Sequence, residues 1–260
     1  MSTTRSAPVQ ADPILDQSRQ PLYRFGALAL LDPQAGAWKR IADPASQTCV
    51  QAAAELIRDE SAEPIPLGLG EFSVETLDPA EVFAKLPDSA EGLNAEYEQI
   101  FGLVASGSCP PLETEYIESK QTFKRSHHLA DVAGFYNAFG LERTPDHPER
   151  QDHIVLELEF MACLIALERA AAEAGETERV EICRAAEKRF LEEHLSWWVP
   201  AFARLLSKER PDGFYAAVGR LLCAFLPTER RRLGVEPPQK PAVPSRMERP
   251  EECDGCLLQT

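Results

Sequence analysis

The stretch from Pro148 to Glu168 constrains the fold more than any other part of the chain. It opens with polar residues at 148–153 and becomes almost wholly apolar from Ile154 to Leu167, with two carboxylates, Glu157 and Glu159, inside the apolar run. The run is shorter than the roughly 20 residues that span a bilayer, and it is too long for an ordinary strand. It therefore predicts a central helix that is buried on nearly every side.

The start of this helix carries a polar pair with two possible interpretations. Asp152 is a suitable N-cap, because its carboxylate accepts from free backbone N–H groups. His153 and Glu157 are four residues apart and share one helix face. The first interpretation is a simple cap followed by a core helix. The second is a polar recognition spot, formed by Asp152 and His153, at the mouth of an apolar groove.

Composition narrows the class of protein. The hydrophobic share of 44% and the charged share of 27% are ordinary for a globular protein. A net charge of −15 argues against nucleic-acid binding, which needs a basic face. The acidic balance suits a basic partner such as a positively charged peptide, or it serves solubility alone.

Location is also indicated by the sequence. The first twenty residues lack the apolar core of a secretory signal, and no apolar run reaches transmembrane length. Neither a signal nor stable membrane insertion is therefore expected. The seven cysteines are scattered and odd in number, which does not resemble a disulfide framework. We expect a reducing, cytoplasmic location.

Helical periodicity recurs along the chain, without strand alternation or an internal repeat. Asp78-Pro79 is a strong helix start, and a second start follows at Asp88 or Ser89. Ser46 or Thr48 is a suitable cap for an alanine-rich helix. Helices are expected at 22–31, 45–59, 79–86, 89–101, 122–141, 148–168, 177–206 and 212–225. Pro200 predicts a kink or break within its helix, and Pro227 is expected to close the last one.

The resulting fold prediction is all-α. We expect a flexible N-terminus (1–18), a single globular domain of about eight or nine helices (19–233) and a disordered, proline-rich tail (234–260). The chain is expected to be a monomer or a homodimer.

No short pattern of an enzyme is present. Phosphate-binding loops, dinucleotide-binding turns, nucleophile elbows and HExxH are absent, as are paired Glu-x-x-His motifs. We therefore expect neither catalysis nor a resident cofactor. The tail contains one CxxC, Cys253 and Cys256. A tetrahedral site needs four ligands, so this pair is either incidental or a metal or thiol site.

Three segments carry a family resemblance. GFYNAFGLERTPDHPERQDHIVLELEFMACLIAL (134–167), EYEQIFG (96–102) and HLSWWVPAF (194–202) occur in this order. They resemble the TorD/DmsD/NarJ group of cytoplasmic chaperones for redox enzymes. The matching positions in the first segment are Tyr136, Asp152, His153, Glu157, Leu158, Phe160 and Met161. Gln151 departs from the pattern, because the family usually has proline there.

The resemblance implies a function. Family members are all-helical and bind the precursor of a molybdenum enzyme of the dimethyl sulfoxide reductase superfamily, in many cases through its twin-arginine leader. They assist cofactor insertion and delay export. Carried over to this chain, the implied partner-binding residues are Asp152, His153, Tyr136, Glu157, Tyr97 and Phe101. The alternatives are an assembly factor that handles an iron–sulfur or zinc centre through Cys253 and Cys256, and a nucleotide-hydrolysing enzyme.

Overall fold

The computed structural model describes residues 13–61, 63–102, 108–117, 122–142 and 149–240, with residues 242 and 244. All regular elements in these ranges are helical, so the all-α prediction is confirmed. The α-helices are α1 (Pro13–Leu30), α2 (Ala37–Ile41), α3 (Pro44–Glu60), α4 (Pro79–Ala84), α5 (Ala90–Phe101), α6 (Thr122–Ala138), α7 (Ile154–Glu173), α8 (Thr177–Phe190), α9 (Ser196–Glu209) and α10 (Phe214–Leu233). The 3₁₀ turns are η1 (Pro33–Ala35), η2 (Val74–Thr76) and η3 (Glu113–Tyr116), and η4 (Leu191–Leu195) is a π-helical turn.

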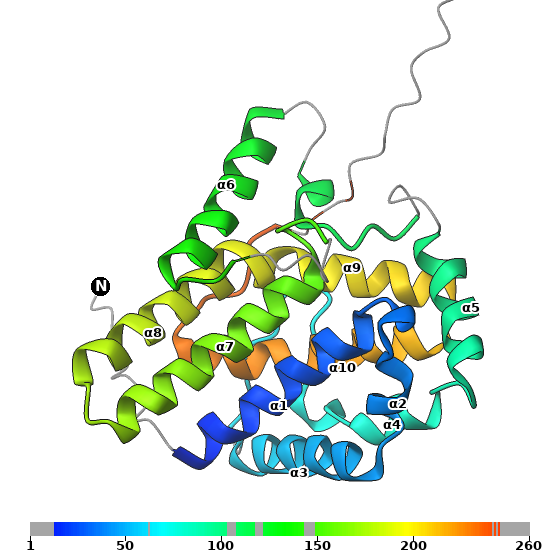
Figure 1. Cartoon of the computed structure of the whole chain (residues 1–260), viewed down its shortest axis with the longest axis horizontal. Coiled ribbons are helices and arrows are strands. Elements are labelled where there is room, and N and C mark those ends of the chain that lie inside the picture. Colours follow the sequence, from blue (N-terminus) through cyan, green and yellow to red (C-terminus); the bar gives the residue numbers. More distant parts are fainter. Residues whose placement is uncertain are drawn as a thin grey trace, which may run out of the picture.

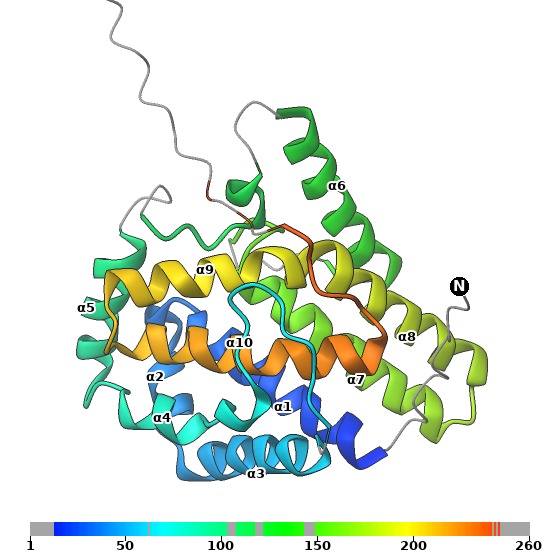
Figure 2. The ribbon, with the colours of Figure 1, turned by 180° about the vertical axis from the view of Figure 1, so that it is seen from behind.

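The helices form a layered body around α7. Helix α7 packs between α1 and α8, and α10 packs against α9 and α1 (Figures 1 and 2). Helix α3 covers the outer side of α1, and α5 lies at one end of the body. Helix α6 projects from the other end (Figure 1). Within the described ranges, no helix combines the length and the apolar character that a membrane crossing requires.

The predicted central helix is confirmed as α7. Its residues are buried over most of its length, including the carboxylates of Glu157 and Glu168. Its N-cap differs from the prediction, however. The capping side chain is that of His153, whose Nδ1 accepts from the backbone N–H of Val155 at 3.3 Å. Asp152 does not cap α7, because other groups engage its carboxylate.

Local start signals were read correctly at two helices and incorrectly at a third. Asp78 caps α4, as predicted, and of the two candidates Asp88 and Ser89 it is Ser89 that caps α5. At α3, however, the cap is Asp43, which accepts from the Ser46 N–H at 2.9 Å. The helix begins at Pro44, so Ser46 lies in its first turn and is not its cap.

The first helix starts earlier than expected. Helix α1 begins at Pro13, and Pro21 lies inside it. Ser18 and Arg19 are buried, so the body includes part of the segment that we expected to be flexible. The cause is long-range. The Arg19 guanidinium donates to Glu229 on α10 and to Glu187 on α8, and these partners anchor the start of α1.

Neither helical proline acts where we predicted. Helix α9 continues through Pro200, and the irregularity lies before it, in the π turn η4. Helix α10 continues through Pro227 to Leu233, so Pro227 does not end it. Proline lacks an N–H and leaves the carbonyl four residues earlier without its helical donor. For Pro227 this carbonyl belongs to Cys223, and the N–H of Phe72 donates to it at 3.0 Å.

The end of α10 agrees with the predicted start of the tail. Gly234 caps the helix in the left-handed conformation, with φ 65°. A side chain is strained there, which explains the glycine. Val235 and Ala242 are nevertheless buried against the body, so the first part of the proline-rich segment packs on it. Cys253 and Cys256 lie outside the described residues.

Candidate functional site

A short extended segment before η3 covers the start of α7. The N–H of Glu113 donates to the Asp152 carbonyl, and the N–H of Ile154 donates to the Pro111 carbonyl, both at 2.9 Å. These two bonds form an isolated antiparallel bridge between Leu112 and His153. The polar start of α7 is therefore held against another segment and does not open directly to solvent.

Asp152 is buried and already paired. Its carboxylate accepts from Arg150 Nε at 2.7 Å and from Arg150 Nη2 at 2.7 Å. It also accepts from the Thr114 hydroxyl at 2.8 Å and from the Thr114 N–H at 3.1 Å. Burial acts to raise the pKa of Asp152, but the bonds from Arg150 and Thr114 prevail and lower it. Asp152 thus remains ionised, with Arg150 as its counter-ion.

His153 is also buried, with 8% of its surface exposed. Burial lowers its pKa to about 4, against the opposing effect of the nearby Asp152 charge. The ring is therefore neutral at pH 7, as its role as an N-cap acceptor requires. The side chains of Asp152 and His153 both face the interior of the fold.

The depressed pKa of His153 makes folding sensitive to acid. The unfolded chain binds a proton near pH 6.5 and the folded chain only near pH 4, so this group's stabilisation is lost as pH falls through that window. The loss is on the order of 3 kcal/mol. We expect His153→Asn, which keeps a capping acceptor, to flatten this part of the pH profile. Urea titrations of both proteins between pH 7 and pH 4 measure it, and parallel profiles would contradict the assignment.

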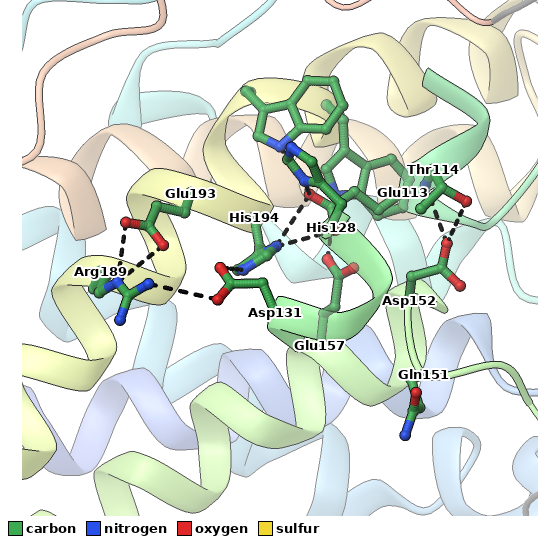
Figure 3. A network of polar contacts seen from close by, with 12 residues as sticks. Glu113, Thr114, His128, Asp131, Gln151, Asp152, Glu157, Arg189, Glu193 and His194 are labelled. Carbon is green, nitrogen blue, oxygen red and sulfur yellow. Dashed lines mark hydrogen bonds and ion pairs between the residues drawn. The ribbon is translucent and has the colours of Figure 1, made fainter. Parts of the chain in front are cut away.

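Glu113 is the centre of a second polar network, next to Asp152 (Figure 3). Its carboxylate is fully buried and lies 3.1 Å from His194 Nδ1 and 3.3 Å from His128 Nδ1. The indole N–H of Trp197 donates to it at 2.9 Å. The hydrogen bond to Glu113 raises the pKa of His128, with burial opposing it. One carboxylate thus links η3, α6, η4 and α9.

Glu157 extends the buried polar groups below Glu113. It accepts from the Trp198 indole N–H at 3.2 Å, and it is fully buried. Burial, followed by the charges of Glu113 and Asp152, raises its pKa well above the usual range. The neutral acid is therefore the favoured form of Glu157 inside the fold.

Tyr136 connects α6 to this region. Its hydroxyl donates to the Gln151 carbonyl at 3.0 Å, and its ring packs on Phe160 with centroids 5.0 Å apart. Asp152, His153, Glu157 and Tyr136 therefore lie in one region of the fold.

Tyr97 and Phe101 contribute to a different cluster. Their rings contact each other at 4.7 Å between centroids, and both pack on Tyr215. Phe101 also stacks near Phe202. These contacts place the two side chains in the aromatic packing between α5, α9 and α10. The structure describes no part of the predicted metal site at Cys253 and Cys256.

Sequence reasoning missed several members of the site. Thr114 and Arg150 hold Asp152, and Glu113 gathers His128, His194 and Trp197. The segment HLSWWVPAF contains His194 and both tryptophans, so its resemblance to the family pattern was the one available signal. Glu113 and His128 lie in segments without any motif that we recognised.

A depression opens beside the Glu113 network. It has a volume of about 580 Å³ and lies between α6 and the π turn η4. Its lining residues are His127, His128, Ala130, Asp131, Glu193 and His194. Imidazole and carboxylate groups in this arrangement can bind cations or basic side chains.

Comparisons with known proteins agree with this architecture. Residues 71–204 match the protein family described as nitrate reductase delta subunit. The selenate reductase assembly chaperone protein of Thauera selenatis is 34% identical over 149 residues, which cover 57% of this chain and 74% of that protein. The chlorate reductase assembly chaperone protein of Ideonella dechloratans is 33% identical over 147 residues, 56% of this chain and 73% of that protein.

A TorD chaperone is also similar. The protein from Aliivibrio salmonicida is 28% identical over 149 residues, which cover 57% of this chain and 67% of that protein. The family match covers more than half of the chain and includes Glu113, the α7 start and the His194 segment. The chain therefore belongs to the family of nitrate reductase delta subunits and TorD-type chaperones.

Proposed function

We propose that this protein is an assembly chaperone for the catalytic subunit of a molybdenum-containing oxidoreductase, and that it acts in the cytoplasm before export. The observation that carries the proposal is the similarity to two relatives named as reductase assembly chaperones, each covered over about three quarters of its length. The family resemblance supplies the client class, the dimethyl sulfoxide reductase superfamily. The role is binding and protection of a partner, and not catalysis.

Coexpression with a candidate client tests this function. The chain is produced together with the catalytic subunit of a molybdenum reductase from its own host. We expect the two to copurify, and we expect the subunit to contain more molybdenum cofactor than when it is produced alone. Failure to copurify with any such subunit of the host, together with unchanged cofactor content, would refute the proposal.

We further propose that the twin-arginine leader of the client is part of what is bound. Such a leader combines a cationic stretch with an apolar one. The net charge of −15 complements the first part. Asp152 supplies a defined position for a guanidinium, because Arg150 already occupies it with two bonds of 2.7 Å. Paired Arg–carboxylate bonds of this kind are among the strongest polar contacts in proteins.

In this proposal Arg150 holds the place of a leader arginine. Its side chain is 44% exposed, so it can swing into solvent, whereas Asp152 is fully buried and fixed by Thr114. A leader guanidinium would replace Arg150 and leave no buried charge unpaired. His153, Glu157 and Tyr136 contribute to this role by fixing the start of α7 around Asp152, and Tyr97 and Phe101 by packing α5 in the neighbouring body.

Leader affinity of two variants tests the exchange. We expect Arg150→Gln to bind a twin-arginine peptide more tightly, because the internal competitor is gone. Asp152→Asn should bind at least about tenfold more weakly, because it loses a charge-assisted bond of roughly 1.5–3 kcal/mol. It should also lose about 1–3 kcal/mol of unfolding free energy, since a buried pair is broken. Isothermal calorimetry and urea titration measure the two effects.

The control is Arg179→Gln, which removes an exposed arginine that pairs with Glu176 at 2.7 Å. This variant should change neither the leader affinity nor the free energy of unfolding by a measurable amount. A twin-lysine peptide should bind more weakly than the twin-arginine one, because lysine lacks the planar fork. Equal affinities of wild type, Arg150→Gln and Asp152→Asn would leave Asp152 with a structural role only.

A further inference from the structure

Three side chains of metal-binding type converge from segments that are distant in sequence. Glu113 comes from η3, His128 from α6 and His194 from the π turn η4 (Figure 3). One ligand atom of each lies within 4.8 Å of the others. Glu113 and His194 are fully buried, and the His128 side chain is 34% exposed. A π turn within a helix is frequently found at a functional site.

The spacing agrees with a tetrahedral cation. Metal–ligand bonds of about 2.0–2.1 Å imply neighbouring ligand atoms about 3.3 Å apart. The Glu113 carboxylate lies 3.3 Å from His128 Nδ1 and 3.1 Å from His194 Nδ1. The third distance in this set is the one between the ligand nitrogens of His128 and His194. Rotation of the partly exposed His128 side chain brings these two nitrogens to the required spacing. Two imidazoles and one carboxylate are a donor set that favours Zn²⁺ over Mg²⁺ or Ca²⁺.

An outer layer of partners holds the ligands in place. The Trp197 indole N–H donates to Glu113 Oε1 at 2.9 Å. The other ring nitrogen of His194, Nε2, lies 3.3 Å from Asp131 Oδ2, an ion-pair distance without the geometry of a hydrogen bond. The nearby carboxylate favours positive charge at the ring, and Nδ1 of His194 faces Glu113 at 3.1 Å.

A second set of ligand-type groups lies close by, but it is already neutralised. Asp131, Glu193 and His194 also bring ligand atoms within 4.8 Å of one another. Arg189, however, donates to both oxygens of Glu193 at 3.0 Å, and its Nη2 lies 3.5 Å from Asp131. A cation placed there would face a guanidinium. Around Glu113, by contrast, the side chains in contact within the described residues are those of His128, His194 and Trp197.

We propose that Glu113, His128 and His194 bind one zinc-class divalent cation. The fourth coordination position faces the depression between α6 and η4, where water or a donor group of a partner completes the shell. The ion would fasten α6 to η3 and η4 through His128. Helix α6 projects from the body, so such a bond would add a further anchor for this helix (Figure 1).

Zinc titration of the tag-free, full-length chain after treatment with a chelator tests the site. Cys253 and Cys256 are both changed to serine in all samples, so that the tail does not bind the metal. We expect one Zn²⁺ per chain, and a melting temperature that rises with Zn²⁺ concentration. His128→Gln should weaken binding by about 100-fold or more, since even loss of an outer partner costs 10–100-fold.

The matched control is His127→Gln. His127 is exposed and lines the depression, but it is not one of the three side chains whose ligand atoms converge within 4.8 Å, so this variant should keep full affinity. Trp197→Phe should weaken binding by about tenfold through Glu113. Co²⁺ in place of Zn²⁺ reports the geometry, and a tetrahedral absorption spectrum should disappear in His128→Gln. Absence of stoichiometric Zn²⁺, or equal affinity of His128→Gln and His127→Gln, would overturn the proposal.

Discussion

Replacement of Arg19 by methionine should lower the free energy of unfolding by about 3–5 kcal/mol. The guanidinium is 2% exposed and donates to Glu229 at 2.7 Å and to Glu187 at 2.6 Å. Methionine fills similar space but leaves these carboxylates without their cation. Burial already raises the pKa of Glu187 to about 8, despite Arg19, so this group gains little from ionisation in the fold. The cost therefore falls mainly on Glu229.

A double-mutant cycle locates the source of this loss. Adding Glu229→Gln to Arg19→Met removes the orphaned charge and should restore part of the stability. Arg24→Met is the matched control, because Arg24 is exposed on the same helix. Its effect should stay within about 0.5 kcal/mol. Urea titration at pH 7 measures the four proteins of the cycle, Glu229→Gln alone included, and the Arg24→Met control. A loss below 1 kcal/mol in Arg19→Met would show that the buried network is not needed for stability.

Phe160→Ala should be about as severe, with a loss of about 3–5 kcal/mol. The Phe160 ring is the point at which three helices meet. Its centroid lies 4.7 Å from Phe190 on α8, 5.0 Å from Tyr136 on α6 and 5.8 Å from Phe139, which directly follows α6. Truncation leaves a cavity among these rings and removes the main apolar contact of α6 with α7. Hydrogen exchange of α6 amides should therefore rise more than that of α1.

The control for this variant is Phe123→Ala, at the other end of α6. Phe123 is 77% exposed, so its removal should change stability by less than about 0.5 kcal/mol. Similar losses of unfolding free energy in Phe160→Ala and Phe123→Ala would mean that burial of the ring does not determine how much its removal destabilises the fold. Faster exchange across the whole chain in Phe160→Ala, with no preference for α6, would show that Phe160 supports the fold globally and does not anchor α6.

Features set by neighbouring residues were predictable from the sequence. The caps Asp78 and Ser89 act within their own first turns, and the apolar run after His153 is long enough to require a buried helix. The order of family motifs also led to the correct family. In each case the information is local, so that composition and spacing within one turn or one helix are sufficient.

Features set by distant residues were not predictable. Pro227 does not end α10, because Phe72, from a loop far earlier in the chain, satisfies the carbonyl that the proline leaves free. Asp152 does not cap α7, because Thr114 reaches it across the isolated bridge. Glu113 gathers partners 15 and 81 residues away in sequence. Rules based on helical periodicity or motif spacing do not cover contacts between residues this far apart in sequence.

The π turn between α8 and α9 also affects how relatives should be aligned. Each helical residue advances the side-chain direction by about 100°. The additional residue in the turn therefore rotates the directions of all side chains that follow it on the helix. In this arrangement the indole N–H of Trp197 donates to Glu113 and that of Trp198 donates to Glu157. A relative that lacks one residue here would keep a continuous helix but present other side chains to both acids. In an alignment, a single-residue gap at 191–195 should therefore distinguish homologues that keep these two tryptophan–glutamate contacts from homologues that place other side chains there.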